Sequence, residues 1–140
     1  MSVQKLNPYL QFNGNAAKAI ELYERALGAK VESLMRHGDM PNATPEKKDL
    51  IMHAALKIGG GELMLSDEMF AAPIAGGKNF YVALHLDDVA DAEKMFAALS
   101  AGGTVTQPFV DTFWGAKFGM LVDAFGVQWM FNCELKKQAA

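Results

Sequence analysis

The fold is decided by a helical pattern that the chain contains twice, as NAAKAIELYERALGA at residues 15–29 and as DVADAEKMFAALSAGG at residues 88–103. In both stretches the apolar residues recur at spacings of three and four, which is typical of a helix with one buried face. Asn15 and Asp88 are of residue types that favour the N-terminal cap of a helix, and the glycines near the far ends favour its termination. We therefore predict two amphipathic helices about 70 residues apart.

A strand-like run precedes each helix, YLQF at residues 9–12 and FYVALHL at residues 80–86. Three more strands are predicted after each helix, because apolar runs there are bounded by turn residues. They span residues 30–36, 50–58 and 62–66 in the first half, and 104–107, 117–123 and 127–133 in the second. The stretches 37–48, 67–78 and 108–114 are interpreted as loops.

Both halves thus follow the order βαβββ, and we predict an α+β fold in which tandem βαβββ units form a curved mixed sheet. One such unit cannot bury its sheet face alone. The halves, residues 7–67 and 79–135, are therefore expected to combine into a single domain over residues 1–140.

Composition restricts the class of protein. The chain has 140 residues, of which 51% are hydrophobic and 21% charged, as in an ordinary globular domain. A net charge of −3 argues against nucleic acid as a partner, because phosphate binding needs a basic surface. No apolar stretch reaches the length of a membrane span, and the opening MSVQKLNPYL has no signal-peptide core. A single cysteine, Cys133, suits a reducing compartment, so we expect a cytoplasmic protein with no membrane partner.

Four strings in the chain resemble the vicinal oxygen chelate superfamily, which includes glyoxalase I, bleomycin-resistance proteins and extradiol dioxygenases. YLQFNGNAAKAIELYERALGA, HAALKIGGGELMLSD, TFWGAKFGMLVDAFG and FGVQWMFN resemble its PhnB-like branch, which is also labelled as a 3-demethylubiquinone-9 3-methyltransferase domain. The resemblance covers almost the whole chain. It implies a glyoxalase-like sheet with a cavity and a homodimer, and it leaves open whether the halves pair within one chain or between chains.

The methyltransferase label has little support in the residues. A methyl donor bound on a doubly wound sheet needs a glycine-rich turn from a strand to a helix. The glycines at residues 59–61 lie instead between two predicted strands. Methyl transfer is therefore kept only as a remote alternative.

The resemblance also implies where a divalent metal would be held. The four positions fall near Pro8, with a one-residue uncertainty toward Asn7 or Tyr9, and on Met64, Tyr81 and Met130. Divalent ions of such enzymes prefer carboxylate or imidazole ligands, whereas thioether sulfur is soft and proline has no side-chain donor. We therefore expect no metal and no other cofactor. The alternative is a divalent-metal-dependent lyase, isomerase or dioxygenase.

The three histidines are the remaining metal candidates, but their spacing matches no known motif. His53 and His85 are interpreted as hydrogen-bonded, partly buried histidines, and His37 as part of a turn with Asp39. Asp67 and Glu68 are interpreted as a solvated turn. Cys133 is expected to be a buried, unreactive thiol. No catalytic residue is assigned, so whether the protein is an enzyme stays open.

Strand alternation, combined with the resemblance, predicts a cavity lined by ring carbon, sulfur and a few neutral polar groups. The predicted ligand-binding residues are Tyr9, Gln11, His53, Met64, Ser66, Tyr81, His85, Trp114, Gln128 and Met130. Such a lining suits a small, mostly apolar or aromatic molecule. Two alternatives stay open: the methionines fill a closed core, or the loop with Trp114 packs on its own domain or a second subunit instead of covering the cavity.

Overall fold

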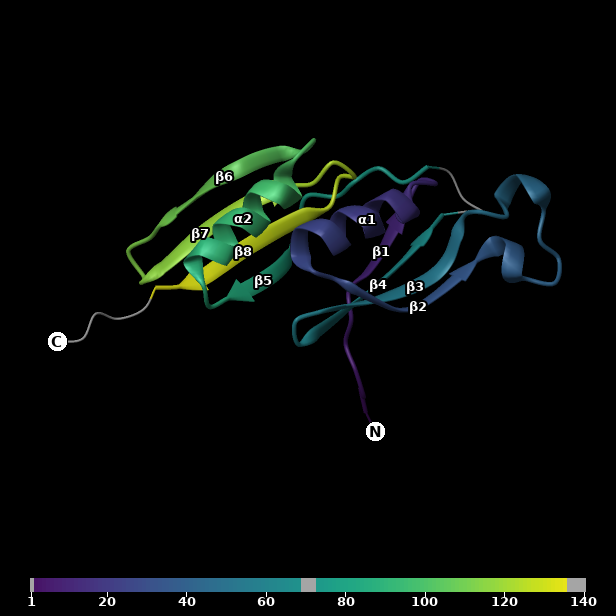
Figure 1. The fold of residues 1–140 in the computed structure, drawn as a ribbon, viewed down its shortest axis with the longest axis horizontal. Helices are drawn as coiled ribbons and strands as arrows, with labels where there is room; N and C mark the ends of the chain where they lie inside the picture. Colours follow the sequence, from purple (N-terminus) through teal and green to yellow (C-terminus); the bar gives the residue numbers. More distant parts are fainter. Residues whose placement is uncertain (1, 69–72, 136–140) are drawn as a thin grey trace. The chain divides into compact units, whose positions relative to one another are not determined.

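The computed structural model describes residues 2–68 and 73–135 and divides the chain into two compact units, Met1–Ala75 and Gly76–Ala140. Each unit contains one helix beside one four-stranded mixed sheet (Figure 1). The predicted α+β fold with two βαβββ units is confirmed. Residues 69–72 of the predicted loop at 67–78 lie outside the described residues.

Unit 1 follows the predicted order of elements. They are β1 (Tyr9–Phe12), α1 (Ala16–Leu27), β2 (Lys30–Arg36), two short 3-10 turns at His37–Asp39 and Pro45–Lys47, β3 (Ile51–Ile58) and β4 (Gly61–Asp67). The sheet has the order β1-β4-β3-β2, in which β1 is parallel to β4 and the other pairs are antiparallel.

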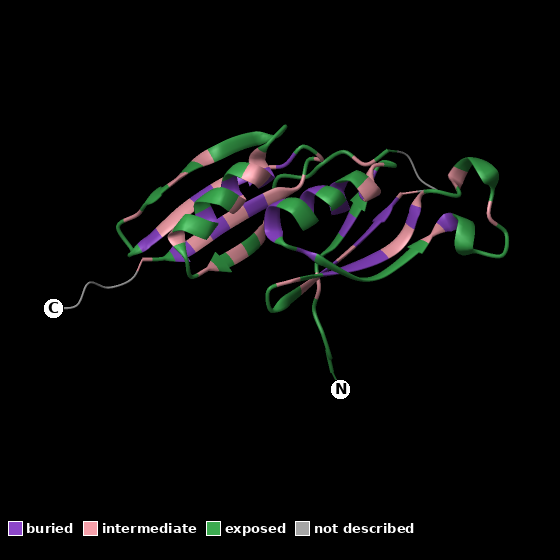
Figure 2. Ribbon diagram, in the orientation of Figure 1, coloured by how far each residue is buried: buried purple, intermediate pink, exposed green. Residues whose placement is uncertain are grey.

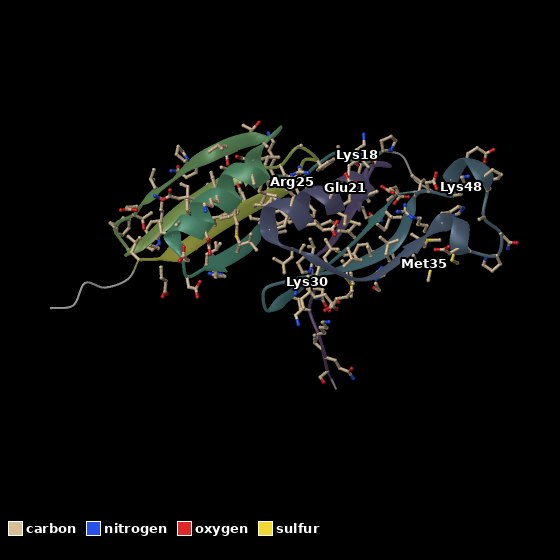
Figure 3. All side chains as sticks on the ribbon, viewed as in Figure 1. Lys18, Glu21, Arg25, Lys30, Met35 and Lys48 are labelled. Atoms are coloured by element: carbon tan, nitrogen blue, oxygen red, sulfur yellow. The ribbon has the colours of Figure 1, made fainter. Side chains whose placement is uncertain are left out.

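The core of unit 1 lies between α1 and one face of this sheet. Leu22 and Tyr23 of α1 are buried, as are Leu63 and Leu65 of β4. Figure 2 shows buried and exposed residues alternating along α1. The charged side chains on the other side of α1 are exposed, among them those labelled in Figure 3: Lys18, Glu21 and Arg25. Because strand residues alternate between faces, Met64 and Ser66 must lie on the sheet face that α1 does not cover.

The start of α1 is held differently from the prediction. Asn15 occupies the N-cap position but makes no side-chain capping hydrogen bond. Instead, Asp67 Oδ1 at the end of β4 accepts the hydrogen bond of Ala16 N at 2.9 Å. Asp67 Oδ2 accepts Ile51 N at 2.9 Å, and the residue is only 3% exposed. The interpretation of Asp67 as part of a solvated turn is therefore wrong.

Unit 2 repeats the plan. Its elements are β5 (Val82–Leu86), α2 (Val89–Ser100), β6 (Thr104–Asp111), β7 (Ala116–Val122) and β8 (Gln128–Glu134), in the sheet order β5-β8-β7-β6. Asp88 caps α2 as predicted, because its side chain accepts Asp91 N at 2.9 Å. The core between α2 and the sheet contains the buried residues Phe96, Leu99 and Trp129. No helix in the described part of the chain is long and apolar enough to cross a membrane.

The predicted loop at 108–114 is wrong in its first half, because β6 continues to Asp111. Pro108 has no backbone N–H to donate. It is tolerated because β6 is an edge strand, which needs hydrogen bonds to a neighbouring strand on one side only. The ring of Phe109 stacks on Phe96 with centroids 5.2 Å apart. A Cβ at Gly119 of β7 would stand 2.9 Å from Phe109 Cα, so this glycine lets the two strands and the ring pack closely.

Candidate ligand-binding faces of the two sheets

The candidate site of unit 1 is the sheet face opposite α1, here called open face 1. The register places Tyr9 of β1 beside Met64 of β4, and Gln11 beside Ser66. On the antiparallel side, Ala55 lies beside Met64. Open face 1 is thus formed by Tyr9, Gln11, Ser33, Met35, His53, Ala55, Met64 and Ser66, with five of the predicted ligand-binding residues among them.

Tyr9 and His53 meet on open face 1, although 44 residues separate them in the chain. The Tyr9 hydroxyl oxygen lies 3.3 Å from His53 Nδ1, and the ring centroids are 5.8 Å apart. His53 is half-buried, and Tyr9 is 48% exposed. The structure agrees with the interpretation of His53 as a hydrogen-bonded, partly buried histidine, and it supplies the partner that the sequence could not.

Two other polar side chains on open face 1, Gln11 and Ser66, differ in their hydrogen bonding. The Gln11 side-chain amide donates to Glu68 Oε2 at 3.2 Å. Ser66 is only 5% exposed, yet its hydroxyl makes no hydrogen bond within the part of the chain that the structure describes. Open face 1 therefore carries the hydrogen-bonded rings of Tyr9 and His53 and the Gln11 amide, which is bonded to Glu68. It also carries the Ser66 hydroxyl, which is available to a ligand.

The candidate site of unit 2 is the sheet face opposite α2, here called open face 2. The register places Ala83 beside Met130 and His85 beside Asn132. Phe118 and Met120 of β7 pair with Asn132 and Met130 on the same face. Gln128 also faces this side, and its amide donates to the backbone oxygen of Phe80 at 2.6 Å. Open face 2 is formed by Tyr81, Ala83, His85, Phe118, Met120, Gln128, Met130 and Asn132.

His85 departs from its interpretation. It is exposed, and its ring makes no hydrogen bond to another described residue. His37, interpreted as part of a turn, does lie in a 3-10 turn but is buried, with Nε2 accepting Thr44 N at 3.4 Å.

Trp114 lies in the turn between β6 and β7 and is 54% exposed. Its ring contacts Phe113 and Phe118, with centroids 5.1 Å and 5.7 Å away. Because Phe118 belongs to open face 2, this contact extends the apolar surface of that face toward the end of β7. Phe113, which is 97% exposed, extends it further into solvent.

The residues at the implied metal positions do not fit a divalent ion. Met64 and Met130 present thioether groups on their open faces, and Tyr81 presents a phenol. Pro8 has no side-chain donor, and its carbonyl already accepts Met64 N at 3.1 Å. Within residues 2–68 and 73–135, no three His, Cys, Asp or Glu side chains come together as a metal site would require.

The thiol of Cys133 lies on the helix-covered side of the sheet of unit 2. Its side chain is fully buried. Burial raises the pKa of the Cys133 thiol, and the nearby carboxylates of Asp87 and Asp88 raise it further, while Lys117 opposes them. A thiol that stays protonated is a poor nucleophile, which agrees with the expected unreactive role.

Sequence reasoning missed the anchoring role of two buried aspartates. Asp67 holds the start of α1, as described above. Asp123 accepts Phe125 N at 2.8 Å and Val127 N at 3.0 Å through Oδ1, and Trp129 Nε1 at 2.9 Å through Oδ2. An aspartate directly after an apolar strand was the available signal, but its partners in unit 1 lie far away in the sequence. Asp67 binds backbone N–H groups, Asp123 binds backbone N–H groups and the Trp129 indole, and neither residue is part of an open face.

The fold and the open faces define a protein of the glyoxalase type, with helices on one side of each sheet and a mixed apolar surface on the other. The chain belongs to the glyoxalase/bleomycin resistance protein/dioxygenase superfamily, whose family model matches residues 5–131. This confirms the family that the sequence resembles.

Individual members of the family are similar to this chain over nearly its whole length. Protein YjdN from Escherichia coli K12 is 33% identical over 138 residues, covering 91% of this chain and 93% of that protein. The crystal structure of protein PA1353 from Pseudomonas aeruginosa is 44% identical, with a TM-score of 0.85 and coverage of 96% of this chain and 100% of that one.

A third relative carries the branch name. A PhnB protein from Bacillus cereus, described as a putative 3-demethylubiquinone-9 3-methyltransferase, is 23% identical with a TM-score of 0.79. It covers 93% of this chain and 99% of that one. At this identity the likeness shows the fold alone.

Proposed function

We propose that the protein binds a small, mostly apolar or aromatic molecule against the open faces of its sheets, without the metal that enzymes of this fold usually hold. The observation that carries the proposal is the chemistry of open face 1. It combines ring carbon of Tyr9 and sulfur of Met64 with the neutral polar groups of His53 and Ser66. Surfaces of this kind hold an apolar body and orient it through a few hydrogen bonds.

Open face 2 supports the same proposal with a more apolar surface. Met130 and Met120 pair directly across β8 and β7, and Phe118 lies one step along. Trp114 adds a second ring at the end of that strand. Flexible methionine side chains adapt to ligands of different outline, so this face favours shape-tolerant binding over selection of one rigid molecule.

Exposed apolar side chains support the homodimer, which together with a single domain is part of this proposal. Val31, Leu34 and Met35 on the edge strand β2 are each at least 39% exposed, as are Val105 and Val110 on the edge strand β6. A second copy of the chain covering such residues would remove apolar area from water. Light scattering should give twice the mass of one chain, and calorimetry should show a single unfolding transition; a monomer with two transitions would contradict both parts.

Methyl transfer is not part of the proposal. Gly59 and Gly60 form the turn between β3 and β4, so the described part of the chain has no glycine-rich turn from a strand to a helix at this place. The methyltransferase activity named for the Bacillus cereus protein is therefore not carried over to this chain, which shares its fold.

A thermal-shift screen with aromatic and quinone compounds tests the binding directly. A ligand that binds only the folded protein raises its melting temperature with concentration, by an amount set by the ratio of concentration to Kd. The screen should be run on protein purified without chelator, together with elemental analysis. A stoichiometric divalent metal would contradict the metal-free proposal, and an unchanged melting temperature across the panel would contradict ligand binding.

A further inference from the structure

The Ser66 hydroxyl is the strongest indication of what a ligand must offer. Ser66 is 5% exposed, and its hydroxyl makes no hydrogen bond within the described residues, where the fully buried side-chain atom without a partner is His37 Nδ1 and not Ser66 Oγ. Ser66 Oγ therefore keeps some contact with solvent, and a ligand that displaces this solvent has to supply a hydrogen-bond partner in its place. Ser66 faces away from α1, so the hydroxyl is directed toward the side where the proposed ligand lies.

The Tyr9–His53 pair lies beside this hydroxyl. The register that pairs Ala54 with Leu65 brings His53 beside Ser66 at its next step. The contact of 3.3 Å between Tyr9 Oη and His53 Nδ1 has two forms. In one, Tyr9 donates and His53 keeps its proton on Nε2; in the other, Nδ1 donates and Nε2 is an acceptor. A ligand group that both donates and accepts is complementary to either form, and a hydroxyl is such a group.

The charges around these three residues disfavour an anionic ligand. The Gln11 amide donates to Glu68 Oε2, which puts an acidic group at this end of the face. Lys57 lies four residues beyond His53, about 13 Å away along a strand, and its register partner Glu62 is ion-paired with Lys5 at 2.7 Å. Arg36 directs its guanidinium to the backbone oxygen of Asp49 at 2.8 Å. A carboxylate or phosphate bound beside Ser66 would therefore lie closer to the Glu68 carboxylate than to Lys57.

We propose that Tyr9, His53 and Ser66 form a specificity-determining subsite for the hydroxyl of a phenol, whose ring lies against the side chains of Met64 and Tyr9. This rests on the proposed function, because it names the ligand class of the same face. The phenolic hydroxyl bonds to the imidazole of His53 and accepts a hydrogen bond from Ser66 Oγ. Sulfur and ring carbon contact the aromatic body, for which methionine is well suited.

The test compares two probes that differ only at the hydroxyl, 2-naphthol and 2-methoxynaphthalene, by calorimetry on the full chain. We expect 2-naphthol to bind about tenfold more tightly, the usual range for one or two neutral hydrogen bonds. Ser66→Ala and His53→Phe should each reduce that preference to about two- to threefold by weakening 2-naphthol and leaving the ether unchanged. Phenylalanine is chosen because unit 2 has Phe118 at the equivalent position.

Ser100→Ala is the matched control for Ser66→Ala, since Ser100 lies at the end of α2 and on neither open face. It should leave the preference for the hydroxyl intact. Equal binding of the two probes to the unmodified protein would overturn the subsite while leaving apolar binding in place. Failure of both probes to bind would overturn the proposed function as well. A preference that survives in Tyr9→Phe, His53→Phe and Ser66→Ala would also refute the assignment.

Discussion

The two units share an order of helix and strands but carry different chemistry at equivalent positions. In the parallel pairs, Met64 lies beside Tyr9 in unit 1, and Met130 lies beside Ala83 in unit 2. Counting from these methionines, Ser66 of unit 1 corresponds to Asn132 of unit 2. His53 corresponds in the same way to Phe118, and Ala55 to Met120. Unit 1 therefore has the smaller side chains at Ser66 and Ala55 and the polar one at His53, whereas its Tyr9 is larger than Ala83 of unit 2.

The comparison extends to the helix-covered side. Counting three residues beyond each methionine equates Asp67 with Cys133. In unit 1 that position supplies the cap of α1, because Asn15 makes no capping hydrogen bond. In unit 2 the helix is capped by its own Asp88, and the corresponding sheet position holds an apolar thiol. The same junction is thus stabilised from the sheet in one unit and from the helix in the other.

Replacing these two aspartates should produce the largest effect and the clearest difference between the units. Asp67→Ala leaves Ala16 N and Ile51 N without their partners in a buried site, at a cost of about 3 kcal/mol. Asp88→Ala removes one exposed cap bond and should cost about 1 kcal/mol. Urea unfolding of both variants measures the free energies. Equal losses would show that the two helix starts are held with equal strength.

The next largest loss of stability is expected when Gly119 of unit 2 is replaced by alanine, the residue at the equivalent position of unit 1. Gly119 corresponds to the buried Ala54, and Gly119→Ala would place a Cβ 2.9 Å from Phe109 Cα and from Phe96 Cε2. Overpacking of this kind typically costs about 1–3 kcal/mol. Gly60→Ala, where a Cβ would meet nothing within 4 Å, is the control and should stay within about 0.5 kcal/mol of the unmodified protein. A neutral Gly119→Ala would mean that the strands separate easily.

Placing a carboxylate at the equivalent methionines sharpens the comparison of the open faces. Met64→Glu and Met130→Glu should each cost less than about 1 kcal/mol, because both side chains are half-buried and face away from the helices. Each new carboxylate lies diagonal to a histidine, His53 or His85, and should give weak Zn²⁺ binding in calorimetry. Loss of folding would place the methionines in a closed core, and unchanged stability without metal uptake would contradict the assignment of the faces.

The smallest expected effect is the pH dependence that comes from Cys133. Its pKa is raised above the ordinary 9.0, so the folded protein keeps the thiol protonated where the unfolded chain releases its proton. The contribution is fully present below pH 9.0 and is lost as the pH rises toward the folded-state pKa. The melting temperature should fall more steeply above pH 9.0 in the unmodified protein than in Cys133→Ala. Parallel curves would contradict the raised pKa.

The parts of this architecture that depend on local pattern could be predicted, and the parts that depend on distant partners could not. The apolar spacing around Leu22 and Phe96 predicted both helices. Alternation along the strand that contains Met64 predicted which of its residues face away from the core. The capping by Asp67 was missed because its partner Ala16 is 51 residues away. Strand β6 was cut short because Pro108 and the aromatic residues after it are typical of a loop.

The candidate site shows the same division. Tyr9, Gln11, Met64 and Ser66 lie together on one face as alternation requires. The contact of Tyr9 with His53 depends on the register of three strands, which residue types alone do not determine. The role of these residues in binding a ligand stays a prediction until the probes above are measured.

The position of Asp67 also bears on the order in which the chain acquires its structure. The hydrogen bond from Asp91 N to Asp88 at the start of α2 joins residues three apart in the sequence. The hydrogen bond from Ala16 N to Asp67 at the start of α1 joins residues 51 apart and can form only after β4 has docked. Contacts between distant segments form slowly because a long loop has to close first. We therefore expect pulsed hydrogen exchange during refolding to protect the first turn of α2 before that of α1, with simultaneous protection counting against this order.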